Sequence, residues 1–305
     1  MLDYAALNAV VAVIREGSFE GAARALRITA SAVSQRVRSF EERLGALVIV
    51  RGSPCRATDL GQMLCAHVDK VKLLEAEISQ QTGAALFQSG EKTTLRLAVN
   101  IDSLATWLPD ILTGYANKAE ICITLIVEDV AQTADLLRSG DVMAAVTTRN
   151  DLLPGCRTVY LGAMHYAACA RPDFVARYFP EGLTGEAIDV APCICLNAQD
   201  SLQRQWLDHA GRTHLSALTH YVPSSRGVLD FTLSGLGWGL QPTTLAAPHL
   251  ASGRLVELDP DNRLEVPLYL ILPRLKSAVL DDLTRHLTQE CAAHPALCPP
   301  SPQDH

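Results

Sequence analysis

Residues 19–38 read FEGAARALRITASAVSQRVR, and they predict the architecture of the amino-terminal domain. The first half is an alanine-rich helix in which Ala22, Ala23 and Leu26 share one face at helical spacing. After a short break, Thr29 is placed to cap a second helix, because its hydroxyl can accept a hydrogen bond from a free backbone N–H. Two short helices joined by a tight turn can set the second helix into the major groove of DNA. The stretch therefore predicts a helix-turn-helix.

The second predicted helix separates apolar from polar side chains. Its apolar residues are expected to face the first helix: Ala32, Val33, Val37 and Phe40. The outer face carries hydroxyl, amide and guanidinium groups, which hydrogen-bond to base edges and phosphates. A helical hairpin with an ordinary solvent-exposed face gives the same pattern. The DNA-contacting residues predicted for this helix and its cap are Thr29, Ser31, Ser34, Gln35 and Arg38.

The residues after this helix favour the DNA-binding interpretation. Residues 47–51 predict a strand, residues 52–54 a turn, and residues 56–58 a returning strand. Such a hairpin is a small wing with Arg51 and Arg56 near its tip. We expect both arginines to reach the adjacent minor groove or the phosphate backbone. A helix-turn-helix followed by a basic wing is a rarer combination than a pair of helices.

Residues 59–81 predict one long helix. Its apolar residues recur every three or four positions, as in a helix that packs against a copy of itself. Packing of the helix on its own domain is the alternative, but two half-sites on DNA require two reading heads, which favours a dimer. Residues 82–93 contain glycine, serine and lysine and are expected to form a hinge. The apolar positions are Leu60, Leu64, Val68, Val71, Leu74 and Ile78.

From Thr94 onward, predicted strands alternate with predicted helices, which indicates βαβ crossovers and a mainly parallel sheet. The pattern occurs twice, and the chain then returns through a strand to a last helix. That return predicts two α/β subdomains, joined by two crossover segments, with a cleft between them. The expected strands are 95–99, 121–127, 142–147, 166–170, 192–196, 219–222 and 266–272, and the expected helices are 103–115 (started or interrupted by Pro109), 131–138, 277–291 and those that begin near Asp173, Ser201 and Ser224.

The charge of the chain is unevenly distributed. Residues 1–60 hold eight arginines and six acidic residues, whereas the remaining residues hold 18 basic and 27 acidic ones. The first segment therefore has a net charge of +2, while the whole chain has −7. This distribution confines DNA to one end of the molecule and suits a cationic small molecule at the other.

Several classes of protein are disfavoured by the composition. No segment approaches the ~18 consecutive apolar residues of a membrane span, and no secretory signal is visible at the amino terminus, so we expect a cytoplasmic protein. The nine cysteines are odd in number and include no CxxC pair, which favours free thiols over disulfides, with a redox or metal sensor as the alternative. Neither a catalytic triad nor an HExxH sequence is present, so we expect no enzyme, no cofactor and no metal. In residues 235–239, GLGWG follows a helix and predicts a helix stop, not a dinucleotide loop.

The run AARALRITASAVSQRVRSFEERLGALVIVR (22–51), followed by RATDLG (56–61), resembles the DNA-binding domain of LysR-type transcriptional regulators. Further on, NIDSLATW (100–107), VED (127–129) and AVTT (145–148) resemble the ArgP/LysG branch of that family. The resemblance spans roughly residues 1–290. Family members commonly carry Gln or Pro where this chain has Ala30 and Ser31, which implies a shifted DNA preference.

The resemblance implies a division of the chain into four parts. A winged helix-turn-helix covers residues 1–58, and a linker and dimerisation helix with its hinge covers 59–92. An effector domain like a periplasmic binding protein covers 93–293, with two Rossmann-like subdomains, 93–163 plus 267–293 and 164–266. Residues 294–305 are expected to form a loose, proline-rich tail.

Ligands of α/β folds bind beyond the carboxyl ends of the strands. We therefore expect Asp102 and Ser103, after the first strand, to contact an amino-acid effector, although either could simply cap its helix. Asp129 is our choice for the carboxylate that binds the cationic end, with a surface ion pair as the alternative. The remaining predicted effector residues lie at other strand ends or at a helix start: Thr147, Asn197 and Ser224.

The function that the resemblance implies is activation of genes for basic amino-acid export, or related genes, in response to lysine or arginine. The implied partners are double-stranded promoter DNA, the effector, a second copy of the chain in a dimer or tetramer, and RNA polymerase. Four alternatives stay open at this point. They are a solute-binding protein, an enzyme on the same fold, an architectural DNA-binding protein, and a LysR-type regulator with a different effector.

Overall fold

The computed structural model describes residues 3–82, 94–119, 121–127, 133–150, 152–209, 215–216 and 218–298. Its amino-terminal domain contains three helices, α1 (Tyr4–Glu16), α2 (Phe19–Leu26) and α3 (Ala30–Leu44), followed by a hairpin of β1 (Ile49–Val50) and β2 (Arg56–Ala57). The predicted helix-turn-helix with a wing is confirmed. Each helix starts at a capping side chain, as expected for exposed backbone N–H groups. The caps are Asp3, Ser18 and Thr29, which accept from the backbone nitrogens of Ala6, Gly21 and Ala32.

The base of the wing is held by α3 and by the helix that follows it. The buried carboxylate of Glu41 accepts hydrogen bonds from the backbone nitrogens of Val48, at 2.9 Å, and Ile49, at 3.3 Å. At Gly61, a Cβ atom would lie 2.1 Å from the carbonyl oxygen of Val48, so the helix can approach the wing only without a side chain there. The wing is therefore held in a fixed position beside α3.

The long helix α4 (Asp59–Thr82) matches its predicted span, but its apolar residues do not form one seam. Leu60, Leu64 and Val68 pack against the core of the amino-terminal domain. For this half of the helix, the alternative prediction, packing on its own domain, is therefore the correct one. Beyond them, Val71 is half-buried and Leu74 is 36% exposed. The Ile78 side chain and residues 83–93, including most of the predicted hinge, lie outside the described residues. In the second half of α4, Leu74 remains available for a partner, and in the first half Met63 is also exposed.

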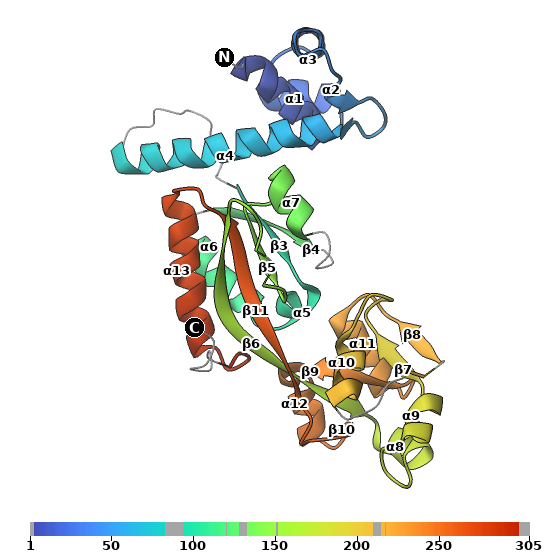
Figure 1. Cartoon of the computed structure of the whole chain (residues 1–305). Coiled ribbons are helices and arrows are strands. Elements are labelled where there is room, and N and C mark those ends of the chain that lie inside the picture. The colour runs from blue at the N-terminus through green and yellow to red at the C-terminus, as the bar shows by residue number, and fades with distance from the viewer. Residues whose placement is uncertain are drawn as a thin grey trace.

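One sheet of nine strands runs through the rest of the chain, in the order β4-β3-β5-β11-β6-β9-β7-β8, with β10 paired to β6. Figure 1 shows the long strands β6 and β11 passing through both halves of the sheet. They are antiparallel to each other, while β3 is parallel to both β4 and β5, and β7 is parallel to both β8 and β9. The predicted α/β halves and their two crossovers are thus present. The prediction of a mainly parallel sheet is wrong, because the crossover strands β6 and β11 pair antiparallel to each other and to their other neighbours. The strands are β3 (Thr94–Val99), β4 (Cys122–Val127), β5 (Ala144–Thr147), β6 (Cys156–Ala170), β7 (Cys193–Cys195), β8 (Thr219–Tyr221), β9 (Trp238–Pro242), β10 (Val256–Glu257) and β11 (Leu264–Pro273).

The helices differ from expectation in two respects. The helix expected over 103–115 is two helices, because the chain breaks at Thr106, before Pro109. Helices α9 and α12 were not predicted. Among the strands, β6 is ten residues longer than expected, since it begins at Cys156. The helices of this domain are α5 (Ile101–Ala105), α6 (Leu108–Ala119), α7 (Thr133–Ser139), α8 (Pro172–Tyr178), α9 (Gly185–Val190), α10 (Leu202–His209), α11 (Ser225–Leu233), α12 (Thr243–Ala251) and α13 (Ala278–Ala293).

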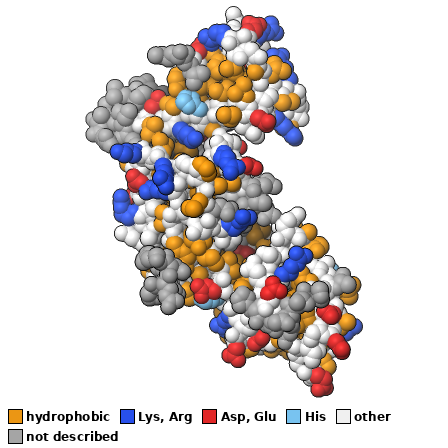
Figure 2. Space-filling model, in the orientation of Figure 1, with side chains coloured by type: hydrophobic (Ala, Val, Ile, Leu, Met, Phe, Trp, Pro, Cys, Tyr) orange, Lys and Arg blue, Asp and Glu red, His pale blue; other side chains and the backbone are white. Residues whose placement is uncertain are grey.

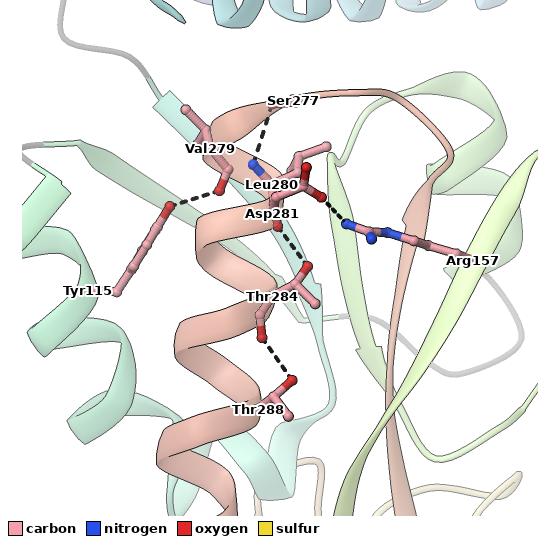
Figure 3. A network of polar contacts seen from close by, with 8 residues as sticks. All are labelled: Tyr115, Arg157, Ser277, Val279, Leu280, Asp281, Thr284 and Thr288. Atoms are coloured by element: carbon pink, nitrogen blue, oxygen red, sulfur yellow. Dashed lines mark hydrogen bonds and ion pairs between the residues drawn. The ribbon is translucent and has the colours of Figure 1, made fainter. Parts of the chain in front are cut away.

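Helix α13 closes the first half of the sheet by polar contacts at its start. The Tyr115 hydroxyl of α6 donates to the carbonyl oxygen of Val279 at 3.0 Å, and Arg157 of β6 pairs with Asp281 (Figure 3). Burial raises the pKa of Tyr115 to about 12, so the phenol stays protonated and able to donate. Ser277 caps the helix by accepting from the backbone nitrogen of Leu280 (Figure 3). These contacts attach α13 to the first subdomain, although its partners Tyr115 and Arg157 lie far from it in the sequence.

The predicted loose tail is wrong for residues 294–298. The backbone of Cys298 exchanges two hydrogen bonds with Ala163 of β6, of 2.9 and 3.2 Å, and Leu297 is buried. A proline-rich composition predicts no regular element, yet an isolated bridge to a strand needs only one correctly placed residue. Residues 299–305 lie outside the described part.

Four expectations from the sequence concern the described residues. Gly235, with φ +84, ends the turn after α11, and β9 begins at Trp238, so the glycine-rich stretch is a helix stop as predicted. All nine cysteines lie in the described part and none forms a disulfide there. In the same part, His, Cys, Asp and Glu side chains form no group of three that could hold a metal. None of the described helices combines the length and the apolar character needed to cross a membrane.

Candidate functional sites

The polar face of α3 is open to solvent. Ser31, Gln35 and Arg38 are exposed and Ser34 is half-buried, so all four lie on the outer side of the helix. Thr29 is exposed too, but its hydroxyl accepts from the backbone nitrogen of Ala32 at 3.2 Å and lies 3.0 Å from the Ser31 hydroxyl. Thr29 therefore acts first as the helix cap, and it also orients Ser31.

The wing presents two cations beside that face. Arg51 and Arg56 are exposed, and Arg56 pairs in register with Val50, the neighbour of Arg51. The Arg51 guanidinium lies 5.6 Å from the centre of the Phe19 ring, a cation–π contact that restrains the arginine near the start of α2. Figure 2 shows Lys and Arg side chains along the outer edge of this domain. A face of hydroxyls, an amide and guanidinium groups can bind base edges and phosphates.

One carboxylate joins the two halves of the domain that contains the nine-stranded sheet. Asp102 lies at the start of α5 in the first half and is 8% exposed. It accepts a hydrogen bond from the Tyr166 hydroxyl of β6 at 2.7 Å, and another, short one from the Ser225 hydroxyl at the start of α11 in the second half. The Asp102–Ser225 bond therefore spans the cleft.

Burial shifts the pKa values of two groups in this contact, Asp102 and Tyr166. Burial raises the pKa of Asp102 above its ordinary value of 3.8, although the hydrogen bonds from Ser225 and Tyr166 oppose the shift. Burial also raises the pKa of Tyr166 well above 10.0, and the neighbouring Asp102 adds to that rise. Tyr166 is thus a stable donor, and Asp102 is a carboxylate that gains from any cation brought near it.

A small cavity of about 10 Å³ adjoins this contact. It lies at the carboxyl end of β7 and among the residues of β9, where helices α10 and α11 begin. Among the described residues that line it, none is Lys, Arg or His, while two are aspartates and two are glutamines. The lining residues are Asp102, Tyr166, Leu196, Asp200, Leu202, Gln203, Ser225, Val228, Leu240, Gln241 and Pro242.

The cap of α5 differs from both sequence interpretations. Neither Asp102 nor Ser103 caps this helix; Asn100 does, since its Oδ1 accepts from the backbone nitrogen of Ser103 at 2.8 Å. The Ser103 hydroxyl is fully buried and accepts from the Trp107 indole nitrogen at 3.0 Å. Ser103 therefore packs in the core and does not join Asp102 in the cavity.

The other predicted effector residues are not brought together at the cavity. Thr147 ends β5, is 2% exposed and accepts from the backbone nitrogen of Arg149. Asn197 stabilises its own turn by accepting from the backbone nitrogen of Gln199 at 2.8 Å. Ser224 caps α11 and accepts from the nitrogen of Gly227, so the neighbouring Ser225 is the residue that faces Asp102. Asp129 lies outside the described residues.

Several residues of the cavity were missed at the level of sequence. Tyr166, Gln203 and Gln241 lie in or near stretches whose sequence pattern indicates only buried structure. No local pattern distinguishes them as binding residues. Asp200 follows β7 within the run NAQD and was detectable as a polar residue beyond a strand end. Its carboxylate accepts from the backbone nitrogens of Leu196 and Leu202. Together with Asp102, it makes the cavity rich in hydrogen-bond acceptors and negatively charged, which suits a cationic ligand with several N–H donors.

Two protein families match the chain. Residues 4–62 match the family described as bacterial regulatory helix-turn-helix protein, lysR family. Residues 88–292 match the LysR substrate binding domain. The first match covers the three helices and the wing, and the second covers both halves of the nine-stranded sheet.

Named relatives align over almost the full length. The HTH-type transcriptional regulator ArgP of Pseudomonas aeruginosa is 39% identical over 94% of this chain and 95% of its own. The lysine export transcriptional regulatory protein LysG of Corynebacterium glutamicum is 38% identical over 91% of this chain and 94% of its own.

Solved structures of proteins with the same names superimpose on this chain. The crystal structure of ArgP from Mycobacterium tuberculosis superimposes with a TM-score of 0.79 at 38% identity, covering 96% of this chain and 98% of that one. Full-length LysG from Corynebacterium glutamicum, described with bound effector Arg, superimposes with a TM-score of 0.69 at 34% identity, covering 98% and 100%.

Proposed function

The chain belongs to the LysR family of bacterial transcriptional regulators, and on that premise we propose that it activates genes for basic amino-acid export, or related genes, when arginine or lysine binds in its cleft. The observation that carries this proposal is the acceptor-rich cavity around Asp102 between the two subdomains. The relative LysG, whose structure holds arginine, supports the choice of a basic amino acid.

The proposed DNA contacts follow from the exposed face of α3 and the wing. Ser31, Ser34, Gln35 and Arg38 would touch bases and phosphates in the major groove. Each good bidentate base contact contributes about 1–3 kcal/mol of discrimination. Thr29 supports this face as the cap, and the wing arginines Arg51 and Arg56 would bind the backbone or the adjacent minor groove.

The proposed switch is a change in the relation between the two subdomains. The Asp102–Ser225 hydrogen bond closes the cleft, so a ligand that donates hydrogen bonds to Asp102 competes with the Ser225 hydroxyl for that carboxylate. A ligand shifts such an equilibrium only by binding one arrangement more tightly than the other. We propose that the effector sets the separation of the reading heads in this way, with Asp102 as its first contact and Asp129 as a second carboxylate.

The proposed assembly is a dimer or tetramer on promoter DNA. The exposed second half of α4 supports self-association, because Leu74 remains available there. Action on the chromosome places the protein in the cytoplasm, and activation would require contact with RNA polymerase. We retain the four-part division of the chain given above, with a shorter loose tail, as our proposed domain organisation.

DNA footprinting of the upstream region of the gene, with arginine, lysine or neither, tests the proposal. We expect protection in all three conditions and a change in the length of the protected region, or in its hypersensitive bands, with one or both amino acids. Isothermal titration calorimetry on the same preparation measures whether either amino acid binds. Protection that no amino acid alters, without binding, would favour an architectural protein. Binding of a non-basic ligand instead would favour a regulator with another effector.

A further inference from the structure

Two buried amides line the cavity beside Asp102, and the oxygen of each lacks a hydrogen-bond donor within the described part of the chain. Gln203 of α10 is 2% exposed and Gln241 of β9 is fully buried. Buried polar atoms are nearly always paired, because an unpaired one loses its hydrogen bonds to water without replacement. Two such acceptors in one small cavity therefore need an explanation.

The orientation of the Gln203 amide follows from its neighbour. Its Nε2 lies 3.0 Å from the carbonyl oxygen of Ile194 in β7. A carbonyl oxygen only accepts, so the nitrogen, and not the oxygen, must occupy this position. The oxygen is left on the other side of the amide.

The orientation of Gln241 follows from a chain of two hydrogen bonds. The Thr232 hydroxyl donates its hydrogen to the carbonyl oxygen of Val228 at 2.8 Å. That hydroxyl can then only accept from Gln241, whose Nε2 lies 3.2 Å away. The nitrogen end of this amide is therefore also bonded to the surrounding protein, and its oxygen is the free end.

The surroundings of both oxygens are acidic and contain no cation among the described lining residues. Asp102 and Asp200 line the same cavity, and each carboxylate accepts from two donors of the protein. Four side chains thus offer only oxygen acceptors or carboxylates to a molecule that enters. Acceptors of this kind complement a group with several N–H donors and a positive charge, of which guanidinium, with five donors in a plane, is the richest.

We propose that Gln203 and Gln241 are specificity-determining residues, which accept hydrogen bonds from the cationic side-chain end of the effector while Asp102 supplies the opposite charge. This inference rests on the proposed function. It places the cationic end of the effector's side chain at the bottom of the cleft. The cavity of about 10 Å³ is on the scale of one water molecule. A guanidinium therefore enters only when the Asp102–Ser225 contact opens.

Calorimetry of the full-length protein with L-arginine, L-lysine and L-citrulline tests the inference, because citrulline has the shape of arginine without its charge. Gln203→Met and Gln241→Met keep the length of the side chain and remove the oxygen. We expect each to weaken arginine binding about ten- to a hundredfold, as for loss of a hydrogen bond to a charged group. Citrulline binding should change much less, so that discrimination between the two ligands shrinks.

Two further variants keep the test decisive. Gln205→Met changes an exposed glutamine on the same helix, and we expect arginine affinity to equal that of the unchanged protein. Gln241→Glu restores the acceptor, and we expect it to bind arginine at least as tightly as the unchanged protein, even where Gln241→Met is poorly folded. Retardation of promoter DNA confirms folding of each variant.

The outcomes separate the two proposals. If the unchanged protein binds arginine or lysine, and neither Met variant weakens that binding more than threefold, the inference is overturned and the amides serve a bound water or the fold alone. If the unchanged protein binds neither basic amino acid, the proposed function itself fails. A Glu variant that loses arginine binding would also overturn the inference, because the acceptor is still present.

Discussion

Asp102 determines the chemistry of the cleft because it is a buried carboxylate whose two donors are neutral hydroxyls. A cation is the partner that would offset the loss of water most strongly, and the described cavity offers none. The anionic form of the residue is thus less stable in this buried position than it would be in solvent. Its neighbours Tyr166 and Ser225 hold it in place and reduce that cost without removing it.

This situation predicts a pH dependence of stability. Since the folded pKa of Asp102 is raised above 3.8, the native state holds a proton that the unfolded state has lost, over the window from 3.8 up to the raised value. Stability from this residue is therefore fully present below pH 3.8 and is lost as the pH rises through the folded pKa. We expect Asp102→Asn to have a higher Tm than the unchanged protein at pH 7, in thermal melts without ligand, and the gap to narrow toward pH 4.

A control and a second readout accompany that prediction. Asp110→Asn changes an exposed carboxylate of the same domain and should show no such narrowing. Asp102→Asn should also bind arginine more weakly, although it is the more stable protein without ligand. A gap in Tm that stays constant from pH 4 to pH 7 would contradict the assigned role of burial.

At the scale of the element, α4 is divided into two functions by its packing. Its first half belongs to the core of the amino-terminal domain through Leu60, Leu64 and Val68. Its second half carries apolar side chains at the same spacing, with Leu74 exposed. A continuous periodicity in the sequence therefore covers two surfaces with different partners.

Two substitutions on α4 should separate these surfaces. We expect Leu74→Glu to shift the protein to a monomer in size-exclusion chromatography with light scattering, because a charge at an apolar interface is desolvated without a partner. Its Tm, extrapolated to low protein concentration, should stay close to that of the unchanged protein. Leu64→Ala should instead reduce the stability of the amino-terminal domain by about 1–3 kcal/mol and leave the oligomer intact. An unaltered mass for Leu74→Glu would exclude this half of α4 from the interface.

At the scale of the whole molecule, α4 also contacts the effector domain. Figure 1 shows it lying between the helix-turn-helix and the first half of the sheet. A Cβ atom at Gly140, after α7, would lie 2.6 Å from the Cβ of Ala66 on α4. Beside this contact, a cavity of about 390 Å³ is lined by residues of the wing, α1, α4 and the effector domain. We expect the approach at Gly140 to be the path by which the first subdomain acts on the DNA-binding domain.

Gly140→Ala tests that path, with Gly155→Ala as the matched control. Both glycines have a positive φ, of +75 and +77, but a Cβ at Gly155 would meet nothing within 4 Å. Each variant should lose about 1 kcal/mol of stability from the backbone strain alone. We expect only Gly140→Ala to change the arginine-dependent footprint, while arginine affinity stays within twofold in both. Equal footprints for the two variants would show that this contact carries no signal.

Much of the architecture was predictable because it depends on local patterns. Helical spacing and the expected cap at Thr29 predicted α2 and α3, and alternation of strands and helices predicted the two α/β halves. The long strand β6 was predicted only at its end, because its first ten residues lack an alternating pattern and are stabilised by pairing with the distant β11. The backbone pairing of residues 294–298 was not predicted for the same reason, because the partner, Ala163, is distant in the sequence.

The chain alone thus determined the family, the exposed polar face of α3 and the two α/β halves with their cleft, because each depends on residues that are neighbours in sequence. The tertiary structure decided which side chains meet in that cleft. Ser225 and not Ser224 faces Asp102, since a shift of one position at a helix start exchanges the capping residue for the first residue of the helix. Gln203 and Gln241 become cavity residues only through hydrogen bonds to Ile194 and Thr232, which consume the nitrogen ends of the amides and leave the oxygens.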